Sequence, residues 1–250
     1  MKSATFRFYA ELNDLLAPRR RGVAFAHEFG GTPSVKDVIE SLGVPHTEVD
    51  LILADGESVD FSWTLADGAR VSVYPVFESI DIAPLLRVRP APLRETRFVL
   101  DGHLGRLARH LRMLGFDVRW QGEARDEDLA RIAAGERRVL LTRDRGLLKR
   151  KTVTHGYWVR ELDPERQLEE VVHRLDLFRS IAPFRRCLRC NEPLVGVSRA
   201  EVADRVPPRV LERHEQFRRC PSCSRIYWAG SHHRRMEQVI ARLLASRSLP

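Results

Sequence analysis

The sequence lacks any long hydrophobic run. No stretch approaches the about 20 apolar residues that a membrane-spanning helix needs. The first residues, MKSATFRFYAEL, also lack the continuous apolar segment of a secretion signal. We therefore expect a cytoplasmic protein with no membrane partner. Cysteines stay reduced in that compartment unless a metal binds them, so we do not expect the four cysteines to form disulfides.

Lysine is scarce, at four residues, and arginine supplies most of the positive charge. Residues 1–80 contain 7 Lys or Arg against 12 Asp or Glu, which is a net charge of −5. Residues 81–250 contain 35 against 22, which is +13. A coding bias toward arginine would not explain the acidic first third. The split predicts two parts with different roles, the basic part offering a surface for a polyanion such as RNA.

Residues 1–80 have the pattern of a small α+β domain. The segment ATFRFYA alternates as a half-buried strand should, and GVAFAHEF follows it as the second strand of a hairpin. Ser34 is expected to cap a helix that stops at Gly43. Further strands follow, in the order typical of a ubiquitin-like β-grasp domain. The domain is either a docking or regulatory module that binds a protein partner, or an appendage that aids folding.

The end of this domain, DGARVSVYPVFESI, is similar to the last strand of the sulfur-carrier proteins. Those carriers need a free C-terminal Gly-Gly, which is absent here. Carrier chemistry is therefore excluded.

The remainder of the chain divides into three segments. Residues 81–96 contain proline and arginine, show no hydrophobic periodicity of a helix or strand, and are expected to be a linker. Residues 97–180 alternate strands (RFVLD, FDVRW, RRVLLT, GYWVRE) with helices, which is typical of a parallel α/β sheet. One helix carries a leucine stripe that ends at Gly115, and Asp163 is expected to cap another. Residues 181–250 contain all four cysteines and a basic C-terminal helix.

Three carboxylates lie where a parallel sheet places its ligands. Asp101 ends the first of these strands, Asp144 follows RRVLLT, and Asp126 opens the helix before that strand. Ligands gather at the carboxyl ends of parallel strands, so we expect a hard-oxygen site for Mg²⁺ or Mn²⁺. Such ions activate water for displacement at phosphorus. Asp126 and Asp144 have an alternative as helix-cap or turn residues, and Glu127 and Asp128 compete with Asp126 for the inward position.

Arginines accompany these acids. One set, which includes Arg112, lies on the helix after Asp101 and is expected to face away from the leucine stripe. Another set flanks Asp144. Guanidinium groups bind phosphate oxygens well, although a solvated helix face is the alternative. The residues that we expect to bind RNA are Arg106, Arg109, Arg143 and Arg145.

The cysteines form two Cys-x2-Cys pairs with no cysteine left over. Two such pairs can hold one tetrahedral metal ion, and four thiolates leave no open position, so the site should be structural. Iron fits the same ligands, but nothing else indicates electron transfer and zinc is preferred. Nearby arginines, together with Tyr227 and Trp228, could contact RNA, although core packing is the alternative role of the two rings. The expected zinc ligands are Cys187, Cys190, Cys220 and Cys223.

Several spaced segments resemble, in order, the Mut-seven-C RNase domain family: FVLDGHLGRLARHLRMLGFDV, DEDLARIA, RRVLLTRDRGLL, CLRCNEPL and FRRCPSCSRIYWAGSHHRRM. The resemblance covers about residues 97–231 and implies a PIN-like fold and metal-dependent ribonuclease activity. Many bacterial members also carry a β-grasp domain in front. The resemblance places the catalytic acids on Asp101, Asp126 and Asp144. A fourth acid would fall on Glu161 or Asp163.

The expected fold class is an α/β PIN-like parallel-sheet domain with an N-terminal α+β β-grasp (ubiquitin-like) domain and a C-terminal zinc ribbon. We expect a metal-dependent ribonuclease, a hydrolase of the endonuclease type, with structural zinc and catalytic Mg²⁺ or Mn²⁺. The main alternative is a non-catalytic RNA- or ribosome-binding protein on a PIN scaffold. A third is a protein-interaction adaptor built on the β-grasp domain. The sequence leaves the RNA and the oligomeric state open.

Overall fold

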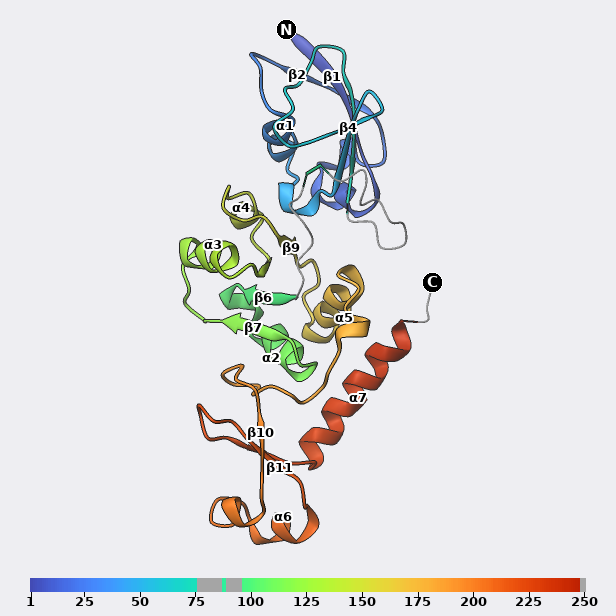
Figure 1. Ribbon diagram of the computed structural model, residues 1–250. Coiled ribbons are helices and arrows are strands. Elements are labelled where there is room, and N and C mark those ends of the chain that lie inside the picture. Colours follow the sequence, from blue (N-terminus) through green and yellow to red (C-terminus); the bar gives the residue numbers. More distant parts are fainter. Residues whose placement is uncertain (76–86, 89–95, 248–250) are drawn as a thin grey trace. The chain divides into compact units, whose positions relative to one another are not determined.

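The computed structural model describes residues 1–75, 87–88 and 96–247 (Figure 1). The chain forms two compact units. The first comprises Met1–Glu95 and Arg125–Trp158, and the second comprises Thr96–Ala124 and Val159–Pro250. Most of the expected linker, residues 81–96, lies outside the described residues. In the described part of the chain, no helix combines the length and the apolar character needed to cross a membrane.

The N-terminal part of the first unit is a mixed five-stranded sheet. Its strands are β1 (Lys2–Phe8), β2 (Phe25–Phe29), β3 (Leu51–Ala54), β4 (Glu57–Val59) and β5 (Arg70–Tyr74). They lie in the order β2-β1-β5-β3-β4. The β1–β2 pair is antiparallel, as the hairpin prediction requires, and β1 pairs with β5 in parallel. This arrangement is the ubiquitin-like β-grasp that the order of elements predicted.

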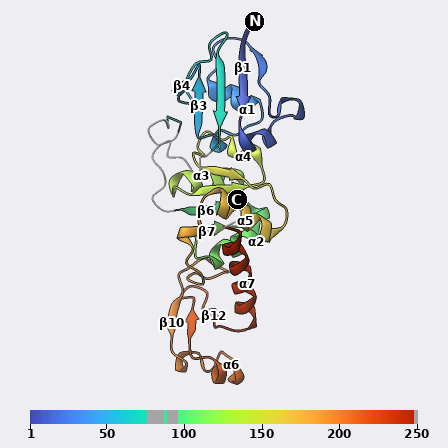
Figure 2. The same ribbon diagram turned by 90° about the vertical axis from the view of Figure 1, so that its right-hand side faces the viewer.

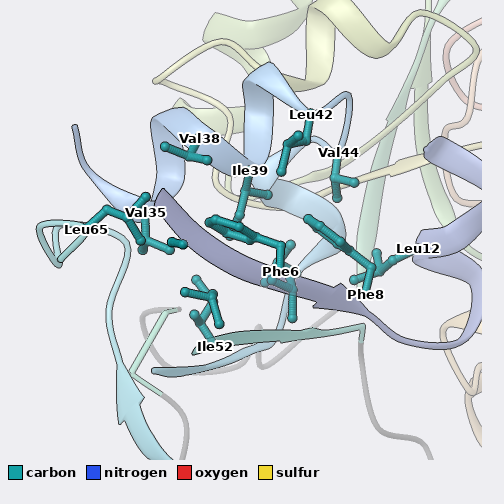
Figure 3. Packing of buried hydrophobic residues seen from close by; sticks show 14 of the residues in the cluster. Phe6, Phe8, Leu12, Val35, Val38, Ile39, Leu42, Val44, Ile52 and Leu65 are labelled. Atoms are coloured by element: carbon teal, nitrogen blue, oxygen red, sulfur yellow. The ribbon is translucent and has the colours of Figure 1, made fainter. Parts of the chain in front are cut away.

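Helix α1 (Val35–Ser41) packs on this sheet. The Ser34 hydroxyl accepts a hydrogen bond from the N–H three residues on, at 3.1 Å, so the predicted cap is confirmed. Gly43 has a φ of +108°, which a residue without Cβ adopts at little cost just after a helix. Phe6 from the sheet and Ile39 from the helix meet in the core and are fully buried (Figure 3).

The first unit also contains the segment from α3 to β9. Its elements are α3 (Asp126–Gly135), β8 (Val139–Thr142), α4 (Arg145–Leu148) and β9 (Gly156–Trp158). Strands β8 and β9 are parallel. All four residues of β8 are buried, which matches its continuous apolar sequence.

The ubiquitin-like domain and the α3–β9 segment pack together within this unit. The ring of Trp158 lies against the apolar core of the domain, and its backbone N–H donates to Glu48 Oε1 at 2.6 Å. His46 is 6% exposed; its Nε2 lies 2.8 Å from the Val153 carbonyl oxygen and its Nδ1 lies 2.6 Å from Glu40 Oε1. Buried polar contacts of this kind hold the ubiquitin-like domain against the α3–β9 segment.

The second unit begins with a β–α–β segment. Strands β6 (Arg97–Leu100) and β7 (Asp117–Trp120) are parallel, and α2 (Gly105–Met113) connects them. Helix α5 (Pro164–Arg174) packs against α2. The leucine stripe of α2 is buried, as its spacing predicted. Asp163 accepts hydrogen bonds from two N–H groups of the first turn of α5, which confirms it as the helix cap.

The cysteine-containing part of the second unit is a small three-stranded sheet (Figure 2). Strands β10 (Val195–Val197), β11 (Phe217–Arg219) and β12 (Ile226–Tyr227) are antiparallel, and a short helix, α6 (Pro208–Arg213), precedes β11. The buried side chains of its apolar cluster are Val202, Val206 and Phe217. A core of this size gives little stability by itself.

The basic C-terminal helix α7 (Ser231–Ser246) joins this sheet to α5. His173 Nε2 on α5 lies 2.9 Å from the Ser246 hydroxyl, and Arg242 forms an ion pair of 2.7 Å with Glu165. The structure confirms the amphipathic helix predicted here, because the buried residues of α7, Ile240 and Leu243, lie three positions apart.

Replacing Gly115 by alanine should destabilise the second unit. Gly115 has a φ of +97°, and a Cβ there would lie 2.1 Å from the Ala182 carbonyl oxygen. Backbone strain and the clash together should cost about 3 kcal/mol. The change should appear as a lower urea midpoint for the intact chain. Gly135→Ala is the control, since a Cβ there meets nothing within 4 Å, and an equal midpoint for both variants would contradict the prediction.

Candidate functional site

The four cysteines converge on one point. Their sulfur atoms all lie within 4.8 Å of one another, and the four thiols form no disulfide. Two of the separations are 3.6 Å (Cys187 to Cys223) and 3.3 Å (Cys190 to Cys220). A tetrahedron with metal–sulfur bonds of about 2.3 Å has edges of about 3.8 Å. The donor set and its geometry therefore fit a structural metal such as zinc.

The two Cys-x2-Cys turns have the same backbone hydrogen bonds. The N–H of Asn191 donates to the Cys187 carbonyl, and the N–H of Ser224 donates to the Cys220 carbonyl, both at 2.9 Å. Both residues after the second cysteine have positive φ, +74° and +57°. Each turn therefore presents two thiols from one tight loop, as a metal knuckle requires.

Hydrogen bonds favour the ionised form of the Cys187 thiol. Burial raises the pKa of Cys187, but hydrogen bonds from Tyr227 and from the N–H groups of its own turn lower it more, to about 6. The Tyr227 hydroxyl lies 3.1 Å from Cys187 Sγ and accepts a hydrogen bond from the Leu188 N–H. Burial raises the pKa of Cys220 to about 12. In the absence of a metal, the hydrogen bonds of the first cysteine turn therefore favour the thiolate of Cys187, whereas burial disfavours the thiolate of Cys220.

Arg112 has a role that the sequence analysis missed. Its exposure is 4%, so Arg112 is open neither to phosphates nor to solvent, the two roles expected for the arginines of this helix. Its Nη1 donates to the carbonyls of Leu188 and Arg189 inside the first cysteine turn, and its Nε and Nη2 both donate to the Val118 carbonyl. Burial lowers the pKa of Arg112, while the nearby Cys187 and Cys190 raise it. Arg112 therefore joins α2 and β7 to the first cysteine turn.

Asn191 completes this junction. Its Oδ1 accepts the Val118 N–H at 2.8 Å and its Nδ2 donates to Asp117 Oδ1 at 2.8 Å. The amide therefore pairs with the edge of β7 as a strand residue would. Sequence offers a weak signal for Arg112, which lies four residues after the buried Ala108 at the edge of the apolar stripe. It offers none for Asn191.

Asp101 and Asp144 each cap a helical turn. Asp101 follows β6 and accepts the His103 N–H at 3.3 Å, among other contacts. Asp144 follows β8 and accepts the Gly146 N–H at 2.7 Å through Oδ1. Its own N–H donates to Thr142 Oγ1 at 2.9 Å. Capping therefore occupies Asp144 Oδ1, and no described residue is hydrogen-bonded to Oδ2.

Asp126 and Asp128 open α3 but have different surroundings. The Asp128 carboxylate is bonded by Arg131 at 3.0 Å and Arg125 at 3.2 Å, and these bonds hold its pKa below the usual value. Asp126 is about half exposed, and its nearest cation is Arg150, 4.0 Å away. Asp126 is therefore the more available carboxylate of the two.

The four arginines expected to bind RNA divide into two kinds. Arg106 and Arg109 are exposed on α2. Arg145 lies over the ring of Trp158, with its central carbon 5.1 Å from the ring centre, and donates to the Leu15 carbonyl at 3.3 Å. Arg143 is half-buried and accepts a hydrogen bond from the Trp158 indole through its carbonyl. Arg145 therefore contacts the ubiquitin-like domain, and RNA binding by Arg143 and Arg145 stays a prediction.

The fourth acid stays a prediction. Asp163 serves as the cap of α5. The N–H of Glu161 donates to Glu170 Oε2 at 3.0 Å, and the N–H of Arg160 donates to Glu170 Oε1 at 2.9 Å, so Glu170 shapes the loop after β9.

Comparison with known families assigns both parts of the chain. The family model of the Mut7-C RNAse domain matches residues 96–240, which is more than half of the chain. The model of the Mut7-C ubiquitin domain matches residues 1–81. Neither a curated protein nor a solved structure matches the chain. The two models occur in the order that the motifs indicated. The chain therefore belongs to the Mut7-C family, with its ubiquitin-like domain preceding its RNAse domain.

Proposed function

We propose that this protein is a metal-dependent ribonuclease that cleaves RNA phosphodiester bonds internally. In this proposal Asp101, Asp126 and Asp144 bind Mg²⁺ or Mn²⁺, and the four cysteines bind structural zinc. The observation that carries it is the match of residues 96–240 to the Mut7-C RNAse domain. Two of the three acids lie within two residues of the carboxyl ends of strands of that domain, where α/β proteins place their ligands.

The carboxylates suit a hard divalent cation. Mg²⁺ and Mn²⁺ prefer oxygen ligands, and one or two carboxylates with several waters is a common Mg²⁺ environment. Asp144 keeps Oδ2 for such a ligand, and Asp126 is solvent-accessible. When bound, the ion would activate water and neutralise charge at the phosphate.

The residues around Asp144 hold its side chain in one orientation. Its N–H is bonded to Thr142, which is fully buried, and its Oδ1 is bonded to the first turn of α4. A carboxylate fixed in this way loses little side-chain conformational entropy when it binds an ion. Arg106 and Arg109 supply exposed cations for the phosphates of the substrate.

The test is cleavage of a circular RNA by the zinc-loaded full chain, with and without added Mg²⁺ or Mn²⁺. An endonuclease opens the circle, whereas an exonuclease needs a free end. Metal-dependent opening is the expected result. RNA retention without cleavage of circular or linear RNA would favour the alternative, a non-catalytic RNA-binding protein.

Replacing Arg106 and Arg109 by glutamine should weaken RNA binding at low salt. Each lost phosphate contact should reduce the slope of log affinity against log salt by about 1. The measurement is a salt titration of binding to a labelled single-stranded RNA. The control is Arg125→Gln and Arg131→Gln together, two exposed arginines that bind Asp128. Equal slopes for both double variants would contradict a specific role for the α2 arginines.

A further inference from the structure

A cavity of about 280 Å³ opens in the cysteine-containing part of the second unit. Four of its lining residues carry aromatic rings: Phe184, Tyr227, Trp228 and His233. The rings of Phe184 and His233 are already paired, with centres 4.1 Å apart and planes inclined by 31°. Pockets for drug-sized ligands measure about 300–1,000 Å³, so this cavity suits a smaller, flat group.

The charge around the cavity is mainly positive. Arg186 and Arg218 line it, and no Asp or Glu is among its lining residues, although Arg186 forms an ion pair with Asp117 at 3.8 Å. Next to lining residues in the chain are arginines at positions 185, 189, 219, 234 and 235 and glutamates at positions 215 and 237. One of the glutamates, Glu237, lies 3.4 Å from His233 Nδ1. The excess of arginine favours an anionic ligand.

The cavity is also tied to the metal site. Tyr227 lines the cavity with its ring while its hydroxyl contacts Cys187 Sγ. Arg186 donates to the carbonyls of Gly115, just after α2, and of Asn191, just after the first cysteine turn, and this fixes one wall of the cavity to both segments. The walls are therefore held by the metal-binding turn and do not depend on a ligand for their shape.

We infer that this cavity binds an unstacked nucleobase of single-stranded RNA, with the surrounding arginines on the adjacent phosphates. Single-stranded RNA is commonly bound by aromatic side chains that stack on its bases inside a basic surface. The inference rests on the proposed RNA substrate and adds a binding site within the cysteine-containing module. An aromatic side chain of a protein partner would stack on the rings equally well, but it would carry no phosphate for the surrounding arginines to bind.

The first test locates the base directly. The zinc-loaded full chain is mixed with an oligouridylate that carries one 5-iodouridine, without added Mg²⁺ or Mn²⁺, and irradiated. Mass spectrometry of the digested complex then identifies the crosslinked residues. We expect crosslinks at Phe184, Tyr227, Trp228 or His233. Crosslinks confined to other parts of the chain would overturn the inference and leave the proposed ribonuclease activity standing.

The second test measures affinity. Phe184→Leu removes one ring and keeps apolar volume, so binding of the same oligouridylate should weaken about five-fold or more. Phe178→Leu is the matched control, because Phe178 also packs on a histidine, His173, with ring centres 4.8 Å apart, but does not line the cavity. Unchanged affinity for Phe184→Leu overturns the inference. Failure of the unaltered chain to bind the oligouridylate also overturns it, while the cleavage test decides separately on the ribonuclease.

Discussion

Replacing Asp144 by asparagine should reduce Mg²⁺- or Mn²⁺-dependent RNA cleavage by about 100-fold or more, because changes to residues that merely support a metal ligand already cost about 10–100-fold. Asparagine is as good a helix cap as aspartate, so the hydrogen bond to the Gly146 N–H survives the change. The substitution therefore removes the charge of the carboxylate with little effect on the fold. Asp101→Asn and Asp126→Asn should lose activity similarly.

The matched control for this experiment is Asp128→Asn. Asp128 lies in the same first turn of α3 as Asp126, but its carboxylate is bonded to Arg125 and Arg131. Cleavage should be nearly unchanged in Asp128→Asn. RNA affinity, measured without divalent ions, should stay at or above the original level in every variant, since each removes a negative charge. Full cleavage by Asp144→Asn combined with Asp101→Asn would sink the proposed metal site.

Replacing Cys220 by serine should release the metal and unfold the cysteine-containing sheet of the second unit. A structural zinc contributes on the order of 10 kcal/mol of folding free energy at neutral pH. The cluster of Val202, Val206 and Phe217 cannot replace that contribution, because so few apolar side chains are fully buried there. We expect about one zinc per original chain and none in the variant, as four ligands on one ion imply.

Hydrogen exchange can follow this unfolding at a single amide. The Val118 N–H donates to Asn191 Oδ1, and Asn191 directly follows Cys190, so its protection depends on the first cysteine turn. Exchange at Val118 should accelerate in Cys220→Ser and after chelation of the metal. Ser222→Ala, an exposed neighbour in the second cysteine turn, should behave like the original chain. A slow Val118 amide in metal-free protein would contradict a structural metal.

Much of the local structure could be predicted from the sequence. The α2 stripe, the Ser34 and Asp163 caps and the glycines at 43 and 115 follow from rules that act within one or two helical turns. The cysteine pairs are equally local, because each pair lies in one tight turn. These features depend on neighbouring residues alone, so no tertiary information was needed to find them.

The tertiary structure decided the role of individual charged residues. Arg106, Arg109 and Arg112 look alike in the sequence, yet only Arg112 meets carbonyls of residues 76 and 77 positions away. A buried guanidinium is stable only where such acceptors surround it. Arg145, whose RNA contact stays a prediction, packs on Trp158 and donates to the Leu15 carbonyl, 130 positions away.

The same distinction applies to the ubiquitin-like domain. Composition and the order of strands identified the domain, but charge alone did not reveal what it docks against. The contacts of Glu48 and His46 with Trp158 and Val153 span more than one hundred positions of the chain. Rules based on the local sequence pattern do not predict contacts between residues so far apart in the chain. The sequence by itself therefore determined the helices, the strands and the two cysteine pairs, whereas folding decided which polar groups are buried together, because that depends on acceptors brought in from distant segments.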